Sequence, residues 1–347
     1  MKLSTLFAGA ATAALMIAAA GAASAQSWAD NTTVSGRMYY DVSTMSTKTN
    51  GTETGPNNGT GFDIKRFYVG IDHKFTDMFS ANITTDFQYS SAIGATEVYI
   101  KKAYLQAAFS PALTVRAGST DMPWIPYAEG IYGYRYVENT VSDRQKVGTS
   151  ADWGLHALGT LPGGVFSYQV SVVNGNGYKN PTRSKTMDIE GRLSAKLDQW
   201  NFAVGGYTGK LGQSVVGTAT PNTASRFNAL AAWIGDQGRL GVEYFSANDY
   251  SAALVKGPAT TDDKAEGYSV FGTYRLNHDW ALFGRADDVK PSKKLTPSKK
   301  DRYFNAGVTY SAFKNVDFSL VLKHDDLTSP GTKVVNNEIG VFAQFLY

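Results

Sequence analysis

Charged side chains are the residues of this chain that could do chemistry, because the usual sets for covalent or metal chemistry are missing. The 347 residues include no Cys, which excludes a thiol nucleophile, a disulfide scaffold and a Cys-based zinc site. Three of the four His lie near predicted turns or strand ends (His73, His278 and His324), and His156 has no motif around it. No Ser-His-Asp set is recognisable. We therefore expect neither an enzyme nor a cofactor or metal site.

The charge balance argues against a nucleic-acid partner. There are 33 Lys and Arg against 30 Asp and Glu, a net charge of +3, so no strongly basic face is implied. The pairs Asp262-Asp263 and Asp325-Asp326 supply carboxylates without the spacing of a calcium loop. What the charged residues do therefore depends on the surface that holds them.

The elements that must position these charges are β-strands. From Val34 onward, apolar and polar residues alternate with a period of two, as along residues 79–88, 187–197 and 317–323. This period places all the apolar members on one face of a sheet. No stretch of comparable length has helical spacing. The sequence predicts an all-β protein.

The connections between strands come in two kinds. Seven short turns lie near residues 77, 111, 163, 198, 237, 278 and 314, and eight longer polar loops separate them, which implies 16 antiparallel strands. Short periplasmic turns that alternate with long extracellular loops are typical of transmembrane barrels of the outer membrane. A β-sandwich also alternates, but Phe79, Trp200 and Trp280 lie beside short turns, as expected at a lipid–water boundary. We predict a barrel.

The first residues have the features of an export signal. Lys2 precedes an apolar stretch over residues 6–20, and Ala23-Ser24-Ala25 fits the cleavage pattern of a signal peptidase. A membrane anchor is the alternative, but the apolar stretch is short for one. We predict a signal peptide over residues 1–25 and a barrel over residues 26–347, located in the cell outer membrane.

The third loop, Ser119–Lys146, is longer than its neighbours and rich in aromatic residues, including Trp124, Tyr132 and Tyr136. A solvated loop has no use for so many rings. A barrel of about 16 strands encloses a wide lumen that a folded loop can narrow. We expect the loop to fold inward, the alternatives being a position across the outer mouth or against a neighbouring subunit.

Two segments resemble a known family. The run Lys65-Arg66-Phe67-Tyr68-Val69-Gly70, and the stretch from Tyr104 through Gly118 with Pro123 soon after, are similar to the phosphate-selective porin O/P family. The resemblance implies a 16-stranded trimeric porin in which the third loop folds inward. The last strand also looks like the terminal signal that the outer-membrane assembly machinery reads in porins, with Phe345 and Tyr347 in its outward-facing row.

Strand parity indicates which charged residues face the lumen. The candidate pore-lining residues on strands are Arg66, Lys74, Lys102, Tyr104 and Arg116, and those in or beside the third loop are Asp121, Glu129, Arg135, Glu138, Asp143 and Arg144. Opposed acidic and basic walls would set a transverse field across the passage, and Lys and Arg favour anions. The alternative is that these charges only solvate a polar interior.

These features predict a porin for passive diffusion of small hydrophilic solutes and ions, with a mild anion preference. The alternative is a channel specific for phosphate, another anion or a sugar, and an outer-membrane enzyme or adhesin is a further reading. The expected partners are outer-membrane lipid, two further copies in a homotrimer, the assembly machinery and the transported solutes.

Overall fold

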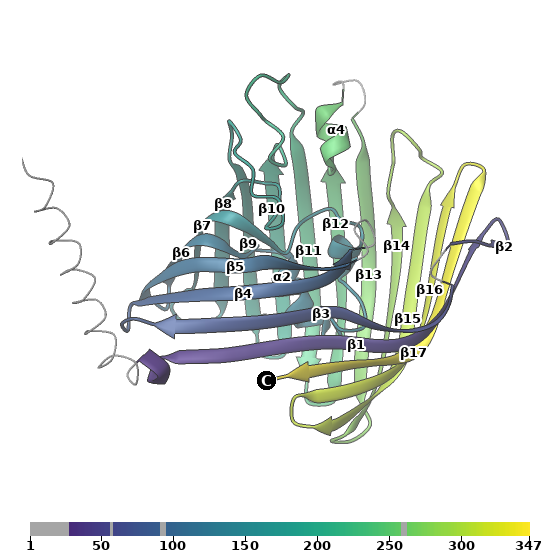
Figure 1. Cartoon of the computed structure of the whole chain (residues 1–347), viewed down its shortest axis with the longest axis horizontal. Helices are drawn as coiled ribbons and strands as arrows, with labels where there is room; N and C mark the ends of the chain where they lie inside the picture. Colours follow the sequence, from purple (N-terminus) through teal and green to yellow (C-terminus); the bar gives the residue numbers. More distant parts are fainter. Residues whose placement is uncertain (1–27, 56–57, 91–94, 258–261) are drawn as a thin grey trace, which may run out of the picture.

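One closed antiparallel sheet forms the body of the molecule. The computed structural model describes residues 28–55, 58–90, 95–257 and 262–347, and the predicted signal peptide lies outside them. Each long strand pairs with the long strands before and after it, and β1 also pairs with β17, which closes the sheet. Arg37 stands opposite Leu346 in this closing ladder, and Thr49 opposite Val334. Figure 1 shows the resulting hollow barrel.

The elements follow in chain order. They are β1 (Thr32–Thr49), β2 (Thr52–Glu53), β3 (Gly59–Lys74), β4 (Phe79–Ser90), β5 (Ala95–Ser110), β6 (Leu113–Asp121), α2 (Ile125–Tyr132), α3 (Val141–Arg144), β7 (Ala151–Thr160), β8 (Phe166–Val173), β9 (Asp188–Leu197), β10 (Trp200–Gly209), β11 (Ala224–Gly235), β12 (Gly238–Asn248), α4 (Ala252–Lys256), β13 (Lys264–Arg275), β14 (Trp280–Lys290), β15 (Lys300–Phe313), β16 (Val316–Ser329) and β17 (Thr332–Leu346).

The strand count confirms the predicted 16-stranded barrel. The two-residue strand β2 belongs to the first connection, where it pairs with β1, so sixteen long strands form the wall. The seven predicted short turns all join consecutive long strands, and the other connections stand at the opposite end. We call these two ends the turn end and the loop end.

The loop-end boundaries of three strands differ from the prediction. Residues 326–333 read as a long loop, but β16 continues to Ser329 and β17 begins at Thr332. Likewise the polar composition of residues 43–60 predicts the first loop, but β1 continues to Thr49. Both faces of these strand ends are at least partly exposed, so polar residues suit both faces and the period-two signal is lost.

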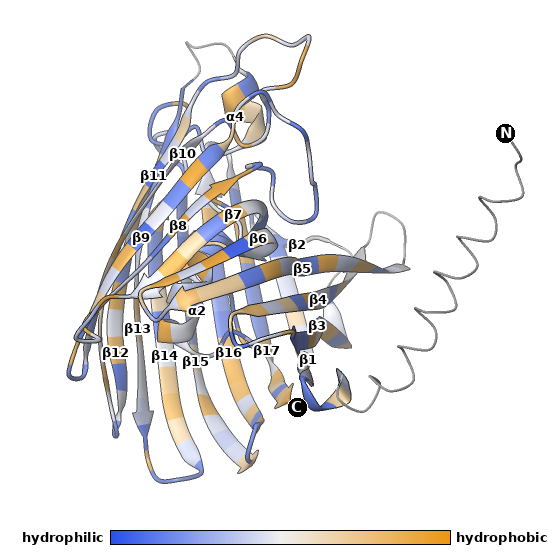
Figure 2. Cartoon of the chain, turned by 90° about the vertical axis from the view of Figure 1, so that its left-hand side faces the viewer, coloured by the Kyte–Doolittle hydropathy of each residue, from blue (hydrophilic) through white to orange (hydrophobic). Residues whose placement is uncertain are grey.

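The outer surface of the barrel is apolar. In β10, Phe202 and Val204 are exposed whereas Ala203 between them is buried, and Figure 2 shows the same banding of hydropathy along the strands. Exposed Trp200 and Trp280 lie beside the turn end. An apolar band flanked by aromatic residues is the surface that a membrane-spanning barrel presents to lipid. Among the described residues, no helix is long and apolar enough to cross a bilayer.

The third loop, between β6 and β7, folds into the barrel as predicted. It contains α2 and α3, and its side chains form three apolar clusters with inward-facing residues of the wall. Trp124, Ile125 and Val141 are each at most 1 % exposed, although they belong to a loop. The apolar core of this protein therefore lies inside the lumen, between the loop and the wall.

Candidate functional site: the lumen beside the third loop

Apolar contacts attach the third loop to one side of the lumen. Trp124 and the buried face of α2 pack against Ala203, Leu230 and Phe271 of β10, β11 and β13. Gly205 makes room for the Trp124 ring, since a Cβ at Gly205 would lie 2.5 Å from it. Further along the loop, two more clusters reach β12–β17 and β1. We call the inner side of β9–β17, which the loop covers, the closed wall.

Two buried carboxylates bind the start of the loop to the closed wall. Glu243 accepts hydrogen bonds from Trp124 Nε1 at 2.8 Å and from Ser142 Oγ at 2.6 Å. Glu190 Oε1 accepts a hydrogen bond from the backbone N–H of Trp124, with an N–O distance of 3.0 Å, and Glu190 also forms an ion pair with Arg226. Because Glu243 is fully buried, the loss of these donors would leave an expensive unpaired charge.

Four arginines of the closed wall donate hydrogen bonds to carbonyl oxygens of the loop backbone. Arg192 reaches Pro123 O at 2.9 Å, and Arg239 reaches Ile131 O at 2.9 Å. In the same way Arg226 donates to Val147 O and Arg285 to Asn139 O. An irregular loop leaves many carbonyls without partners, and the five donors of a guanidinium suit them. These inward-facing charges therefore hold the loop in place.

Arg144, a predicted pore-lining residue, is bound in the same wall. Its guanidinium lies 2.6 Å from Asp301, 3.2 Å from Asp287 and 3.3 Å from Asp325, and only 11 % of the side chain is exposed. Gln145 also donates to Asp301, at 2.8 Å. Three carboxylates thus surround one cation, and we assign Arg144 to the attachment of α3.

Three cavities lie on the other side of the loop, against the inner side of β3–β6, which we call the open wall. The turn-side cavity has a volume of about 680 Å³ and is lined by residues that include Asn82, Tyr104 and Arg37. The two loop-side cavities have volumes of about 310 and 320 Å³. One lies beside residues 137–139 and the other beside residues 176–180.

Four side chains stand where these cavities meet. Arg135 of the third loop lines all three cavities, and Arg66 lines both on the loop side. Tyr68 and Lys101 each line the turn-side cavity and one loop-side cavity. We call these four residues the junction.

Two β-bulges add basic residues to the open wall. The register between β1 and β3 shifts at Tyr39, so that Lys65 has no ladder partner, and the register between β4 and β5 shifts so that Lys101 has none. A bulge places two successive side chains on the same face. As a result, Lys65 joins Arg66 inside the barrel, and Lys101 joins Lys102.

Contacts with buried inward-facing groups show where the two extra lysines point. Lys65 Nζ lies 3.4 Å from Asp41 Oδ2 and 3.7 Å from Glu338 Oε1. Lys101 Nζ lies 3.4 Å from the Tyr68 hydroxyl and 4.6 Å from the centre of its ring. Strict alternation would have turned both lysines to lipid. The available signal was the basic pairs themselves, since an alternating membrane strand cannot keep two successive charges out of lipid.

The structure brings several predicted site residues together near the junction. Arg135 Nε lies 2.5 Å from Glu129, and Asp143 is 3.6 Å from the same guanidinium. Lys102 pairs with Asp121 at 2.5 Å. Lys102 was predicted from strand parity, and the other four residues were predicted in or beside the third loop.

Other predicted residues have different surroundings. Arg66 pairs with buried Asp86 at 3.0 Å, and Arg116 donates to Gln106 at 2.8 Å while its guanidinium lies 4.8 Å from the Tyr104 ring. Lys74 is more than half exposed at the turn end of β3 and pairs with Asp77 at 2.8 Å. The structure therefore does not bring Lys74 to the junction.

Two carboxylates of the loop respond differently to their surroundings. Burial alone would raise the pKa of Glu138, but Lys323, 3.6 Å away, and Arg285 hold that pKa at about 2. For Asp143, burial raises the pKa above its ordinary value in spite of the opposing effect of Arg135. Glu138 therefore stays ionised in mild acid, whereas Asp143 takes up a proton earlier than an ordinary Asp.

Comparison with known proteins identifies the fold. No model of a known protein family and no curated protein matches the sequence. Among solved structures, the chain is similar to the outer membrane channel DcaP of Acinetobacter baumannii, with a TM-score of 0.64, 12% identity and coverage of 91% of this chain and 97% of that one.

Two further structures agree with this result. The anion-selective porin from Comamonas acidovorans has a TM-score of 0.63 and 12% sequence identity, and the alignment covers 90% of this chain and 99% of the porin chain. OmpT of Vibrio cholerae has a TM-score of 0.62 and 13% sequence identity, and the alignment covers 91% of this chain and 97% of the OmpT chain. The chain therefore has the 16-stranded antiparallel barrel fold of the outer-membrane porins.

Proposed function

We propose that this protein is a porin of the outer membrane, through which small hydrophilic solutes and ions diffuse passively with a preference for anions. The observation that carries the proposal is the row of cavities along the open wall, which meet at basic side chains. A water-filled lumen narrowed by an ordered loop admits small polar solutes, and the charges at its narrow part select among them.

The anion preference rests on the charges of the junction and of the loop-side cavity beside residues 176–180. The ionisable side chains that line this cavity, besides tyrosine, are Arg66, Lys101, Arg135, Lys146, Lys179 and Asp143. Five cations and one carboxylate line the cavity. Even with Arg66 paired to Asp86 and Arg135 paired to Glu129 behind the lining, an anion that enters from the loop end meets an excess of positive charge. No carboxylate of the described residues lies within 4.0 Å of Lys101 Nζ, so its charge is less compensated than that of Lys102.

A planar-bilayer measurement tests both parts of this proposal. Purified protein in a KCl gradient is expected to give discrete conductance steps and a reversal potential with the sign of chloride selectivity. The absence of steps would contradict the channel. Steps with a potassium-selective reversal potential would leave the channel and contradict the anion preference.

A channel specific for one oxyanion is the second candidate. Lys101 favours it, because the residue is only 9 % exposed and its ammonium contacts a tyrosine rather than a carboxylate. A site of this kind would bind phosphate or a carboxylate and reduce the chloride current in a saturable way. A linear dependence of conductance on phosphate concentration would favour general diffusion.

The trimer and the assembly signal are part of the same proposal. An OmpT structure from Vibrio cholerae, described as the trimer form, has a TM-score of 0.61 and 12% identity to this chain, which supports a homotrimer. Phe345 packs edge-to-face on Phe318, and Tyr347 exchanges two backbone hydrogen bonds with Gly36. Native mass spectrometry of the purified protein is expected to give the mass of three chains, and deletion of Tyr347 is expected to reduce its amount in outer membranes.

A further inference from the structure

The fourth loop, residues 174–187 between β8 and β9, folds over the inner side of the barrel wall. Asp152, the second residue of β7, is fully buried, and strand parity directs its side chain to the lumen. Its Oδ2 accepts hydrogen bonds from the backbone N–H groups of Gly175 at 2.9 Å and Gly177 at 3.1 Å. The backbone N–H of Tyr178 donates to the first residue of β7 at 3.0 Å. The start of the loop is therefore attached to the inner side of β7.

The next two side chains of the fourth loop reach across to the open wall. The Tyr178 hydroxyl donates a hydrogen bond of 2.7 Å to Asp86 Oδ2 on β4, and the same oxygen lies 3.0 Å from the Arg66 guanidinium. Asp86 is fully buried, and Tyr178 is only 9 % exposed. Lys179 Nζ lies 4.2 Å from the centre of the Tyr99 ring on β5. A loop that starts on β8 is thus bound to the ion pair that holds Arg66 in the junction.

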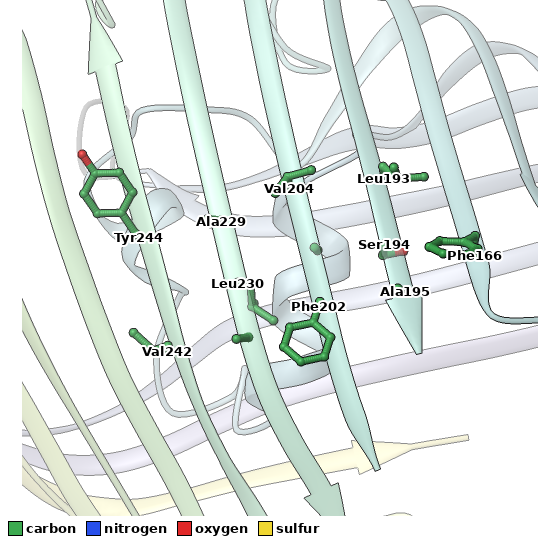
Figure 3. A pocket seen from close by; sticks show the side chains of 12 residues that line it. Phe166, Leu193, Ser194, Ala195, Phe202, Val204, Ala229, Leu230, Val242 and Tyr244 are labelled. Atoms are coloured by element: carbon green, nitrogen blue, oxygen red, sulfur yellow. The ribbon is translucent and has the colours of Figure 1, made fainter. Parts of the chain in front are cut away.

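These contacts place one loop-side cavity between two loops. Residues 176–180 of the fourth loop line it together with Arg135 and Lys146 of the third loop, and its volume is about 320 Å³. Figure 3 shows, by contrast, the depression on the outer face of β8–β12, which is lined by apolar side chains such as Phe202 and Val242. A hydrophilic solute suits the inner cavity, because polar and charged groups line it.

We propose that the fourth loop forms a second constriction on the loop side of the junction, and that the contact between Tyr178 and Asp86 sets its width. The inference rests on the proposed function, because a constriction acts on solutes only in a conducting channel. The Tyr178 hydroxyl holds the loop against the open wall, and Lys179 adds a cation to the lining. The third and fourth loops together then select solutes by size and charge.

Single-cysteine labelling tests whether the fourth loop lines the passage. The chain has no Cys, so an introduced thiol is the only one that reacts. Asn180→Cys places it in the cavity lining. Modification with 2-sulfonatoethyl methanethiosulfonate, added to the loop-end side of a planar bilayer, should reduce the current about twofold or more and lower the anion preference. The matched control is Val216→Cys, at a residue that is 81 % exposed and lines none of the three lumen cavities, and its modification should leave the current unchanged.

A second measurement tests what sets the width. Tyr178→Phe removes only the hydroxyl that binds the loop to Asp86, so single-channel conductance should rise about 1.5-fold and a disaccharide should enter proteoliposomes faster. Tyr250→Phe is the control, because it removes a hydroxyl that donates to Pro291 O at 2.6 Å in a part of the loop end outside the three lumen cavities. This control should conduct as the wild type does.

The outcomes separate the inference from the proposed function. Complete modification of Asn180→Cys, verified by mass spectrometry, without a change in current would place the fourth loop outside the passage and overturn the inference. Equal conductance of Tyr178→Phe and Tyr250→Phe would overturn the role of the Tyr178 contact. The labelling result decides if Tyr178→Phe does not fold. The absence of conductance in the wild type would instead count against the proposed function.

Discussion

The closed wall and the open wall of the lumen carry the same kinds of charged side chains, but they use them differently. On the closed wall, Arg226 and Arg285 combine an ion pair with a hydrogen bond to the loop backbone, and both are almost buried. On the open wall, Lys101 lines two cavities, facing Arg135 of the third loop. A basic residue that faces the lumen is therefore bound to the loop or left beside a cavity, according to whether the third loop covers it.

This difference explains how one barrel can combine a rigid constriction with a hydrated path. Apolar contacts, carbonyl-to-arginine hydrogen bonds and buried ion pairs attach the loop to the closed wall. Its other side is free to present Glu129, Arg135 and Asp143 to solutes. Rigid support for such residues keeps a selective passage at a constant size.

The largest effect is expected from the loss of a closed-wall cation. Arg285→Met removes the nearer of the two arginine partners of Asp287, which lies 2.6 Å away with its side chain fully buried, and also a hydrogen bond to the loop; Arg144 remains 3.2 Å from Asp287. Breaking a buried pair in this way costs about 3–5 kcal/mol. Urea-induced unfolding in detergent should show a reduction of this size in the free energy of unfolding.

An exposed arginine at the loop end of β15 provides the control. Arg302 pairs with Asp288 at 3.3 Å, and its side chain is 64 % exposed. Because exposed pairs contribute roughly 0–1 kcal/mol, Arg302→Met should leave the free energy of unfolding nearly unchanged. Similar losses in both variants would contradict the distinction between the two walls.

A smaller effect, of a different kind, is expected on the open wall. Lys101→Met keeps much of the side-chain volume but removes a charge that borders two cavities. A unit charge about 4 Å from a passing ion is worth about 1 kcal/mol in water, and salt reduces this. The ratio of anion to cation permeability should fall about threefold in reversal-potential measurements.

The control for this variant is Lys74→Met at the turn end, outside the junction. It should leave the permeability ratio close to that of the wild type. If Lys101→Met instead lowered stability as Arg285→Met does, without a change in selectivity, Lys101 would belong with the structural cations.

The sequence was sufficient for the barrel but not for the division of its inner wall. A period of two, seven short turns and an aromatic-rich third loop predicted 16 strands and an inward loop, because these signals are local. The bulges at Lys65 and Lys101 are one-residue shifts in register, which depend on the partner strand. Arg144 lies in the third loop and Arg285 on the wall, so the roles of both depend on where the loop packs, and no local pattern encodes that position.

The smallest effect is expected from a change of pH on anion selectivity. It distinguishes two carboxylates of the loop, Asp143 and Glu138. Burial raises the pKa of Asp143, whereas Lys323 and Arg285, acting against burial, lower the pKa of Glu138 to about 2. As the pH falls from 7 toward 4, Asp143 begins to lose its negative charge while Glu138 keeps its own. The passage becomes more positive, so anion selectivity should rise, by about 1.5-fold for a partly screened charge.

The sign for stability follows from the same two shifts. A carboxyl with a raised pKa in the folded state disfavours folding at neutral pH, and this cost is relieved as the pH falls through the raised pKa. The stabilisation from Glu138 is present above its ordinary pKa and is lost only as the pH falls toward about 2. Asp143→Asn should therefore abolish the rise in selectivity between pH 7 and pH 4, whereas Glu138→Gln should leave that rise in place. A rise that survives Asp143→Asn would contradict the assignment of the pH response to Asp143.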